Sequence, residues 1–473
     1  MVDRQLVREL TERLSARLVE AIHADNSGRP ADSSGRPHDN PSSDRASTDG
    51  RRVGLREDRG RLEMLMGRWM AEELASLNQT RLQRGEMLLD DESDRELRRL
   101  AYAETIGTGP LEQFMTDPDV EEIDVNSHLV TWISYADGRK LNAGRLWDSA
   151  EDLSAFQNRL TLSIGVSEAR LDEQSPMVTL QAPDGSRVVM VLGGPGRNGV
   201  STQPRIAIRR FTVHRVGLGG LSDRGLFPQW LVPQLEALVV SGMTLLISGG
   251  PGAGKTTLLQ ELLGAVPPSE RIVTIEKGLL ELRLEDDPRH PDAPALFTRQ
   301  ANTDGRGEIT ARSLVELTRR MNPDRVVVGE LVEDEALEML DVASMCKRGS
   351  MATIHSHTAE AVLSRLAFYV AKSNTSLPEF AVWSLIADTI DFVIHIDLVR
   401  NTAGGAPRRQ VTSIIEFGGR GPDGGVRSTE VWGLDDVGRF VQRAPLEQRH
   451  VRRLRLAGIA EGLFVPSDGL VLR

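Results

Sequence analysis

The sequence predicts an α/β protein in which a domain with a parallel sheet follows a smaller α+β domain and a helical and disordered N-terminal extension. In the second half of the chain, strands that are apolar throughout alternate with helical stretches, a pattern typical of a parallel sheet covered on both faces. Residues 105–215 read instead as short strands and turns around a few helices. Residues 25–59 are too polar to bury enough surface to offset their ordering entropy.

Composition narrows the function classes. With 473 residues, of which 40% are hydrophobic, the chain is long enough for two to four domains with real cores. Its net charge of −11 argues against a protein whose main role is to coat nucleic acid, so no direct nucleic-acid partner is expected. No apolar run is long enough to span a membrane, and the charged start MVDRQLVREL does not resemble a signal peptide. We expect a cytoplasmic protein.

The N-terminal extension begins with an amphipathic helix, predicted over residues 1–24. Its apolar residues recur at every fourth position: Leu6, Leu10, Leu14, Leu18 and Ile22. This stripe needs a partner surface. Because residues 25–59 are expected to be a disordered linker, we expect the helix to dock a separate partner on a flexible tether. Residues 60–104 are predicted to be helical again.

The remaining boundaries follow from turns and glycine. Within the α+β domain of residues 105–215, Asp137-Gly138 and Asp184-Gly185 are expected hairpin turns. The glycine-rich segment 216–226 is expected to be a linker. The parallel-sheet domain is placed at 227–420, and residues 421–473 are expected to be a C-terminal extension with a further strand and a basic, solvated helix face.

A glycine-rich loop with a following lysine predicts a nucleotide site. Gly249-x-x-x-x-Gly254-Lys255-Thr256 lies between an apolar strand and a helix, which is the context of a phosphate-binding loop. Glycines let backbone N–H groups surround a phosphate, Lys255 can reach the β- and γ-phosphates of ATP, and the Thr256 hydroxyl can ligate Mg²⁺. The predicted nucleotide-binding residues of the loop are Gly249, Gly250, Pro251, Gly252, Ala253, Gly254, Lys255, Thr256 and Thr257.

Three further side chains end predicted strands. Glu330 ends DRVVVGE, where a carboxylate can polarise water or support the metal, and Glu276 ends RIVTIE in the same way. His355 ends SMATIH, and the residues leave two roles open: a packed or hydrogen-bonded histidine, or a sensor of the γ-phosphate. With His357 it forms a pair that could ligate zinc, but no other His or Cys cluster completes such a site.

Several blocks in order resemble the type II/type IV secretion ATPase superfamily, and most of all its CpaF-like group of Tad/Flp pilus ATPases. They include IAIRRF, SGGPGAGKTTLL, RIVTIE, RMNPDRVVVGE and GSMATIHSHTAEAVLSRL. The resemblance implies a hexameric ring of two-domain subunits, each with a RecA-like ATPase domain. It also implies that the ring drives pilus assembly or secretion from the cytoplasmic face of the inner membrane, on membrane platform proteins.

The resemblance also implies residue roles. Lys255 and Thr256 match the Walker A lysine and threonine, and Glu330 matches the Walker B glutamate. Glu276 matches the Asp-box glutamate and His355 the His-box histidine. Arg209 matches an arginine that approaches the phosphates from the N-terminal domain, and Arg320 matches a further family arginine.

Three departures bear on turnover. Where the family usually has TIED, this chain has TIEK, so Lys277 replaces an acid. Where the family has GEVRGGEA or GELRGGEA, this chain has GELVEDEA, so Val332 replaces an arginine. Where the family has TIHAN, this chain has TIHSH, so His357 replaces an asparagine. Lys277 is expected either to stabilise the ionised form of Glu276 or to point to solvent. We expect an active ATPase that is slow or dependent on a partner. An ATP-binding ring component without hydrolysis, a DNA-transfer ATPase and a small-molecule kinase stay open as alternatives.

Overall fold

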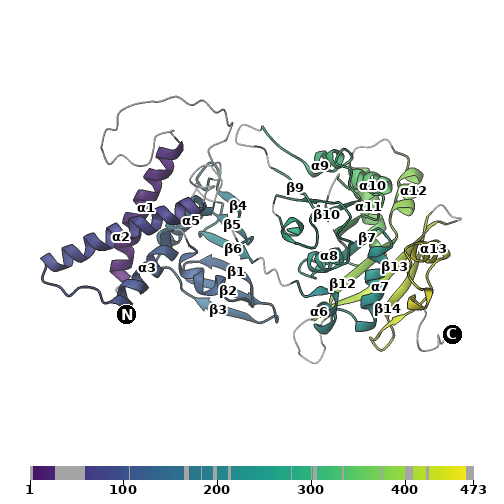
Figure 1. The fold of residues 1–473 in the computed structure, drawn as a ribbon, viewed down its shortest axis with the longest axis horizontal. Helices are drawn as coiled ribbons and strands as arrows, with labels where there is room; N and C mark the ends of the chain where they lie inside the picture. Colours follow the sequence, from purple (N-terminus) through teal and green to yellow (C-terminus); the bar gives the residue numbers. More distant parts are fainter. Residues whose placement is uncertain are drawn as a thin grey trace. The chain divides into compact units, whose positions relative to one another are not determined.

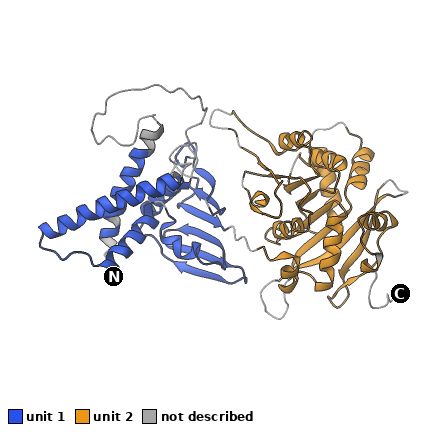
Figure 2. Ribbon diagram, viewed as in Figure 1, with its two compact units in different colours: residues 1–212 blue, residues 213–473 orange. Residues whose placement is uncertain are grey.

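The computed structural model describes most of the chain: residues 4–26, 59–105, 107–164, 170–182, 184–194, 200–210, 215–278, 280–299, 301, 306–332, 335–373, 377–399, 408–421 and 425–464. Residues 27–58 of the predicted linker lie outside this set. The chain forms two compact units, residues 1–212 and residues 213–473, which Figure 2 colours separately. Each unit has its own β-sheet and its own apolar core.

Unit 1 begins with three helices that Figure 1 shows side by side: α1 (Arg4–Asn26), α2 (Arg59–Gln83) and α3 (Asp91–Thr105). The apolar stripe of α1 is buried, since Leu10, Leu14 and Leu18 are at most 4% exposed. They share one core with Trp69 of α2 and Leu97 of α3. The expectation that this helix docks a separate partner is therefore wrong, because α2 and α3 cover its stripe within the chain.

The rest of unit 1 is an α+β domain with an antiparallel sheet in the order β3-β2-β1-β6-β5-β4. Its strands are β1 (Val120–Ser127), β2 (Val130–Tyr135), β3 (Lys140–Gly144), β4 (Met177–Gln181), β5 (Arg187–Val191) and β6 (Arg205–Arg209). The helical elements are η1 (Gly109–Leu111), α4 (Glu112–Met115) and α5 (Ala150–Ile164). The expected turns at Asp137-Gly138 and Asp184-Gly185 join β2 to β3 and β4 to β5. Alternating residues of β6 share a core with α5, so one face of the sheet is covered.

Unit 2 contains a nine-stranded sheet in the order β15-β14-β13-β12-β7-β11-β10-β8-β9. The strands β12, β7, β11, β10, β8 and β9 pair in parallel, and β13, β14 and β15 add an antiparallel edge. The bounds are β7 (Leu245–Gly249), β8 (Ile272–Glu276), β9 (Ala295–Phe297), β10 (Arg325–Leu331), β11 (Met351–His355), β12 (Phe392–Val399), β13 (Arg408–Arg420), β14 (Val426–Leu434) and β15 (Phe440–Gln442). The predicted α/β fold with a parallel sheet is confirmed.

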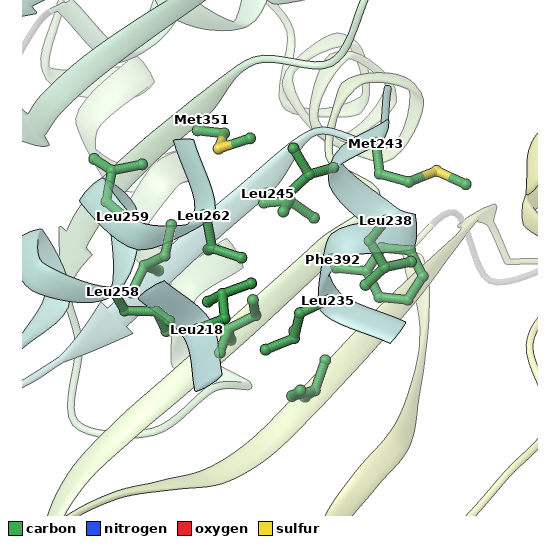
Figure 3. Close-up of a cluster of buried hydrophobic side chains, with 14 of the residues drawn as sticks. Leu218, Leu235, Leu238, Met243, Leu245, Leu258, Leu259, Leu262, Met351 and Phe392 are labelled. Carbon is green, nitrogen blue, oxygen red and sulfur yellow. The ribbon is translucent and has the colours of Figure 1, made fainter. Parts of the chain in front are cut away.

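Helices cover both faces of this sheet. They are α6 (Gly217–Asp223), α7 (Val232–Val240), α8 (Lys255–Leu263), α9 (Ala311–Thr318), α10 (Glu335–Met345), α11 (Ala361–Lys372), α12 (Glu379–Thr389) and α13 (Gln448–Leu456), with the shorter η2 (Gln229–Leu231), η3 (Leu284–Asp286) and η4 (Glu461–Phe464). Strand β7 is buried throughout, and Leu245 and Leu246 face two different cores. Figure 3 shows Leu258 and Leu262 of α8 beside Leu245 of β7. This packing fixes the helix that follows the glycine loop.

The segment 216–226 is not a free linker. Its glycine-rich sequence forms α6, in which Leu218 and Leu221 are buried in the same core as α8. The carboxylate of Glu261 on α8 accepts the N–H groups of Val216 (3.1 Å) and Gly217 (2.9 Å) at the start of α6. The leucines and this cap attach the segment to unit 2, which begins at Val213.

Within the predicted extension 421–473, the described residues 425–464 are part of unit 2 rather than a separate extension, and residues 465–473 lie outside the described set. Strands β14 and β15 complete the sheet, and Trp432 is fully buried in its core. The basic helix α13 has one buried face, where the fully buried His450 lies 3.0 Å from Asp391 and also contacts Glu416. The expectation of a solvated face therefore holds for only part of α13. No helix in the described part of the chain is both long and apolar enough to cross a membrane.

Candidate functional site

The glycine loop joins β7 to α8 at the carboxyl end of the parallel strands. Gly252 and Gly254 have φ angles of +71° and +94°, which residues with a side chain rarely adopt. A Cβ on Gly249 would lie 2.3 Å from the carbonyl oxygen of Ile396 on β12. The loop therefore requires its glycines for conformation at two positions and for space at a third.

Three side chains from different elements form one chain of contacts beside this loop. Lys255 Nζ, on α8, lies 3.0 Å from the carbonyl oxygen of Gly250 and 3.1 Å from His355 Nδ1 at the end of β11. His355 Nε2 lies 2.6 Å from Glu330 Oε1 on β10. Since an ammonium group only donates, it fixes Nδ1 as the acceptor, and Nε2 carries the proton that it donates to Glu330. The structure thus brings together three of the predicted catalytic residues, Lys255, His355 and Glu330.

Strand order explains why these residues meet. In the parallel sheet, His355 of β11 pairs in register with Gly249 of β7, and β10 pairs on the other side of β11. The carboxyl ends of neighbouring parallel strands lie at one edge, so the strand-end residues converge on the loop.

Glu276 ends β8 in a more buried position. It is 4% exposed and lies against Gly329, the neighbour of Glu330, where a Cβ would be 3.4 Å from Glu276 Cγ. Its Oε2 accepts the N–H groups of Glu281 (2.6 Å) and Leu282 (2.8 Å). Burial raises the pKa of Glu276 to about 7, and the two N–H donors oppose that rise. Its other oxygen, Oε1, is buried without a hydrogen-bond partner among the described residues, so one acceptor of this carboxylate is unused.

Lys277 does not act on Glu276. Its Nζ lies 2.9 Å from Oε1 of Glu335, at the first residue of α10, and the same oxygen accepts the Val332 N–H at 2.9 Å. Glu335 is 1% exposed, so Lys277 neutralises a buried carboxylate. Lys277 is therefore at the surface, as one expectation has it, although its ammonium group pairs with Glu335; the other expectation, a stabilised ionised form of Glu276, is wrong, because burial raises the pKa of that carboxyl.

The remaining predicted residues are more scattered. Thr256 is half-buried and Thr257 exposed on the first turn of α8. Arg209 is exposed at the end of β6 in unit 1, and no hydrogen bond or ion pair of its side chain is seen among the described residues. Arg320 is exposed in the turn before β10, at the amino ends of the strands, so the structure does not bring it to the loop. His357 is also exposed.

These residues fit a nucleotide with its metal ion. The loop has glycine where a side chain would clash and a lysine whose Nζ contacts the Gly250 carbonyl oxygen, and Glu276 on the same sheet has a buried oxygen that accepts no hydrogen bond among the described residues. Among the described residues, no three His, Cys, Asp or Glu side chains are grouped to hold a metal ion by themselves. A bound Mg²⁺ would therefore take its ligands mainly from phosphate oxygens and water, with Thr256 and Glu330 as the protein groups that would hold it.

The sequence reasoning missed a basic residue beside the loop. Arg409, near the start of β13, donates from Nε to the carbonyl oxygen of Gly252 at 3.0 Å. It is brought there because β12 lies between β13 and β7, and Leu398 of β12 pairs with Arg409. No local motif marks this arginine; only the strand order of the sheet edge could have identified it.

Comparisons with known proteins identify the family of this chain. The sequence model of the family described as "Type II/IV secretion system protein" matches residues 147–418. A putative conjugal transfer protein of Mycobacterium tuberculosis is 30% identical over 356 residues, which cover 74% of this chain and 94% of that protein. Protein VirB11 of Agrobacterium fabrum is 26% identical over 314 residues, covering 60% of this chain and 87% of VirB11.

A solved structure of the ATPase DotB from Legionella pneumophila is 17% identical, with a TM-score of 0.45, and covers 63% of this chain and 78% of DotB. The match of the family model and the M. tuberculosis relative show that the chain belongs to the type II/IV secretion system protein family.

Proposed function

We propose that this protein is an ATPase that hydrolyses ATP to ADP and phosphate and drives Tad/Flp-type pilus assembly or type II/IV secretion. The observation that carries the proposal is the chain of contacts from Lys255 through His355 to Glu330, next to a glycine loop. Phosphate binding, charge neutralisation and water activation require groups of these kinds at one place.

The site's own residues divide the chemistry. The N–H groups of the loop and of the start of α8 attract phosphate. On binding, the Lys255 ammonium group gives up its hydrogen bonds to the Gly250 carbonyl oxygen and His355 Nδ1 and donates to phosphate oxygens instead. Bound Mg²⁺ would neutralise phosphate charge, held on the protein side by Thr256 and Glu330. Once Lys255 has moved to the phosphates, Nδ1 of His355 is released while Nε2 still orients Glu330.

Water activation falls to the two carboxylates. Glu330 is half-exposed and can accept a proton from water or polarise it, as a general base does. Glu276 is buried with one vacant oxygen, so we assign it the positioning of that water from the second side. His355 then senses the γ-phosphate at Nδ1 and orients Glu330 through Nε2.

The assembly is proposed from the family. We propose a homo-hexameric ring at the cytoplasmic face of the inner membrane, which engages the platform proteins of a pilus or secretion machine. Arg209 of unit 1 is proposed to reach the phosphates, and we propose that Arg320 serves the ring rather than the loop of its own subunit, since it lies at the opposite sheet edge.

Phosphate release from purified protein tests the proposal. With ATP and Mg²⁺ we expect turnover that EDTA stops, and Lys255→Ala should abolish both nucleotide binding and turnover. Nucleotide binding without phosphate release at any Mg²⁺ concentration would favour an ATP-binding ring component instead.

A second candidate is a DNA-transfer ATPase, favoured by the printed description of the M. tuberculosis relative as a putative conjugal transfer protein. The two candidates share the loop and differ in their cargo. Stimulation of phosphate release by added single- or double-stranded DNA would favour the second, and an unchanged rate would favour the pilus or secretion motor.

A further inference from the structure

The N–H donors of Glu276 belong to a loop that other side chains hold in place. Leu282 N–H donates to Glu276 Oε2 at 2.8 Å, and the carbonyl oxygen of the same peptide group, that of Glu281, accepts from Gln260 Nε2 at 2.7 Å. Gln260 lies on α8, the helix that begins at Lys255. One peptide group therefore connects the helix of the phosphate loop to the buried carboxylate, and each hydrogen bond polarises the other.

Arg215 holds the same loop from its other side. Its guanidinium lies 3.4 Å from the carbonyl oxygens of Leu282 and Arg283, and it forms an ion pair with Asp287. The Asp287 side chain is 4% exposed and that of Arg215 is 21% exposed, so water screens this pair little.

The loop conformation needs such support. Arg283 has a φ angle of +42°, in the left-handed region that a residue with a side chain rarely enters. Arg215 contacts the carbonyl group of Leu282, which immediately precedes this residue, and the carbonyl group of Arg283 itself. Without the guanidinium, the loop is free to relax from Arg283, and the Leu282 N–H moves with it.

Arg215 is also the first described residue of unit 2. The next two residues, Val216 and Gly217, are capped by Glu261 of α8. The start of the unit is thus attached at once to the helix of the phosphate loop and to the loop that holds Glu276.

We propose that Arg215 is a positioning residue for Glu276, acting through the carbonyl groups of Leu282 and Arg283 and through Asp287. The proposal rests on the proposed function only for the role of Glu276 in hydrolysis; the geometric part stands without it. Arg215 does not contact the phosphate loop in the described structure, so its loss should affect the catalytic step and spare nucleotide binding.

Hydrogen exchange of the full chain, read by mass spectrometry over residues 278–287, tests the geometric part. In Arg215→Ala we expect the amides of Glu281 and Leu282 to exchange at least about tenfold faster than in the wild type, since their hydrogen bonds open more often. The matched control is Arg289→Ala, because Arg289 also pairs with Asp287, at 2.9 Å, while no contact of its side chain with the two carbonyl groups is seen in the described chain. That variant should exchange at these amides as the wild type does.

Steady-state kinetics test the catalytic part. We expect kcat of Arg215→Ala to fall about tenfold or more and KM for ATP to change less than about twofold, because a displaced catalytic group lowers turnover rather than binding. Arg215→Lys keeps the charge beside Asp287 but cannot bridge both carbonyl groups. It should therefore also speed exchange of the Glu281 and Leu282 amides, by a smaller factor than Arg215→Ala does. It also replaces Arg215→Ala if that variant does not fold.

The outcomes are separable. Equal exchange in the Arg215 variants and Arg289→Ala would overturn the proposal, as would a loss confined to KM. A wild type that releases no phosphate would refute the proposed function, and the exchange measurement would still decide whether Arg215 holds the Glu276 loop.

Discussion

Replacing Lys277 tests whether its ion pair with Glu335 stabilises unit 2. At 2.9 Å and an effective dielectric constant of about 20, the attraction between the two charges is on the order of 6 kcal/mol before desolvation is subtracted. The Lys277 side chain is 38% exposed and regains hydration when the pair is broken, whereas Glu335 is left, among the described residues, with the Val332 N–H. We therefore expect Lys277→Met to lower the free energy of unfolding by about 1–3 kcal/mol.

Urea unfolding of full-length protein measures this effect, and a double-mutant cycle with Glu335→Gln isolates it. The coupling energy between Lys277 and Glu335 should be about 1–3 kcal/mol. Lys347→Met is the control, because Lys347 pairs with Asp324 at 3.1 Å but is 73% exposed, so its loss should cost less than about 0.5 kcal/mol. Equal losses for the two lysines, or a coupling energy near zero, would refute the reasoning.

The same contact reverses an expectation about activity. From sequence, Lys277→Asp restores the family's TIED and should raise turnover several-fold by freeing Glu276. In the structure the new carboxylate would lie beside buried Glu335, so we expect a less stable protein without a faster rate.

Three other changes follow from the fold and the site. Burial raises the pKa of Glu276 from 4.5 to about 7, so between these values the folded state keeps a proton that the unfolded state loses. The contribution of this proton to the free energy of unfolding is therefore full below about pH 4.5 and is lost as the pH rises through 7. Glu276→Gln should remove this pH dependence from urea unfolding. The kcat/KM profile should fall below about pH 7 as Glu276 becomes protonated, because Oε2 already accepts two N–H groups and the proton therefore lies on Oε1, which then donates to water instead of accepting from it. Leu14→Ala, at a fully buried position of α1, should destabilise the α1–α3 core by about 2–4 kcal/mol in thermal unfolding; an unchanged midpoint would mean that α1 does not pack there. His450→Ala leaves Asp391 and Glu416 buried without their shared partner and should cost unit 2 about 3 kcal/mol in urea, whereas a neutral result would show that α13 is dispensable.

The sequence predicts those site residues best whose position follows from the end of a single strand. Lys255, His355 and Glu330 each end or follow an apolar strand, and parallel pairing alone carries such residues to one edge. The partners of Lys277 and Arg409 depend instead on which way a side chain turns and on which strand pairs with β12 next to β7. Neither property is encoded in the local pattern around these residues.

The N- and C-terminal parts show a second limit. The every-fourth spacing of leucines predicts the helix α1 and its apolar face, but periodicity cannot say that α2 and α3 cover that face. The arginine-rich run of α13 suggests a solvated helix, and yet His450 within it is fully buried between two carboxylates from β13 and the start of β12. Burial of a charged segment depends on partners that are distant in sequence.

Glu330→Gln provides the most direct test that ATP is hydrolysed at the Lys255–His355–Glu330 site. Binding of a fluorescent ATP analogue and steady-state phosphate release are measured side by side for the wild type and the variant. We expect the dissociation constants to agree within about threefold and the rate of the variant to be lower by about 10²–10⁴, because glutamine keeps the size of the side chain and loses the base. Full phosphate release by Glu330→Gln would contradict the assignment of water activation to this carboxylate.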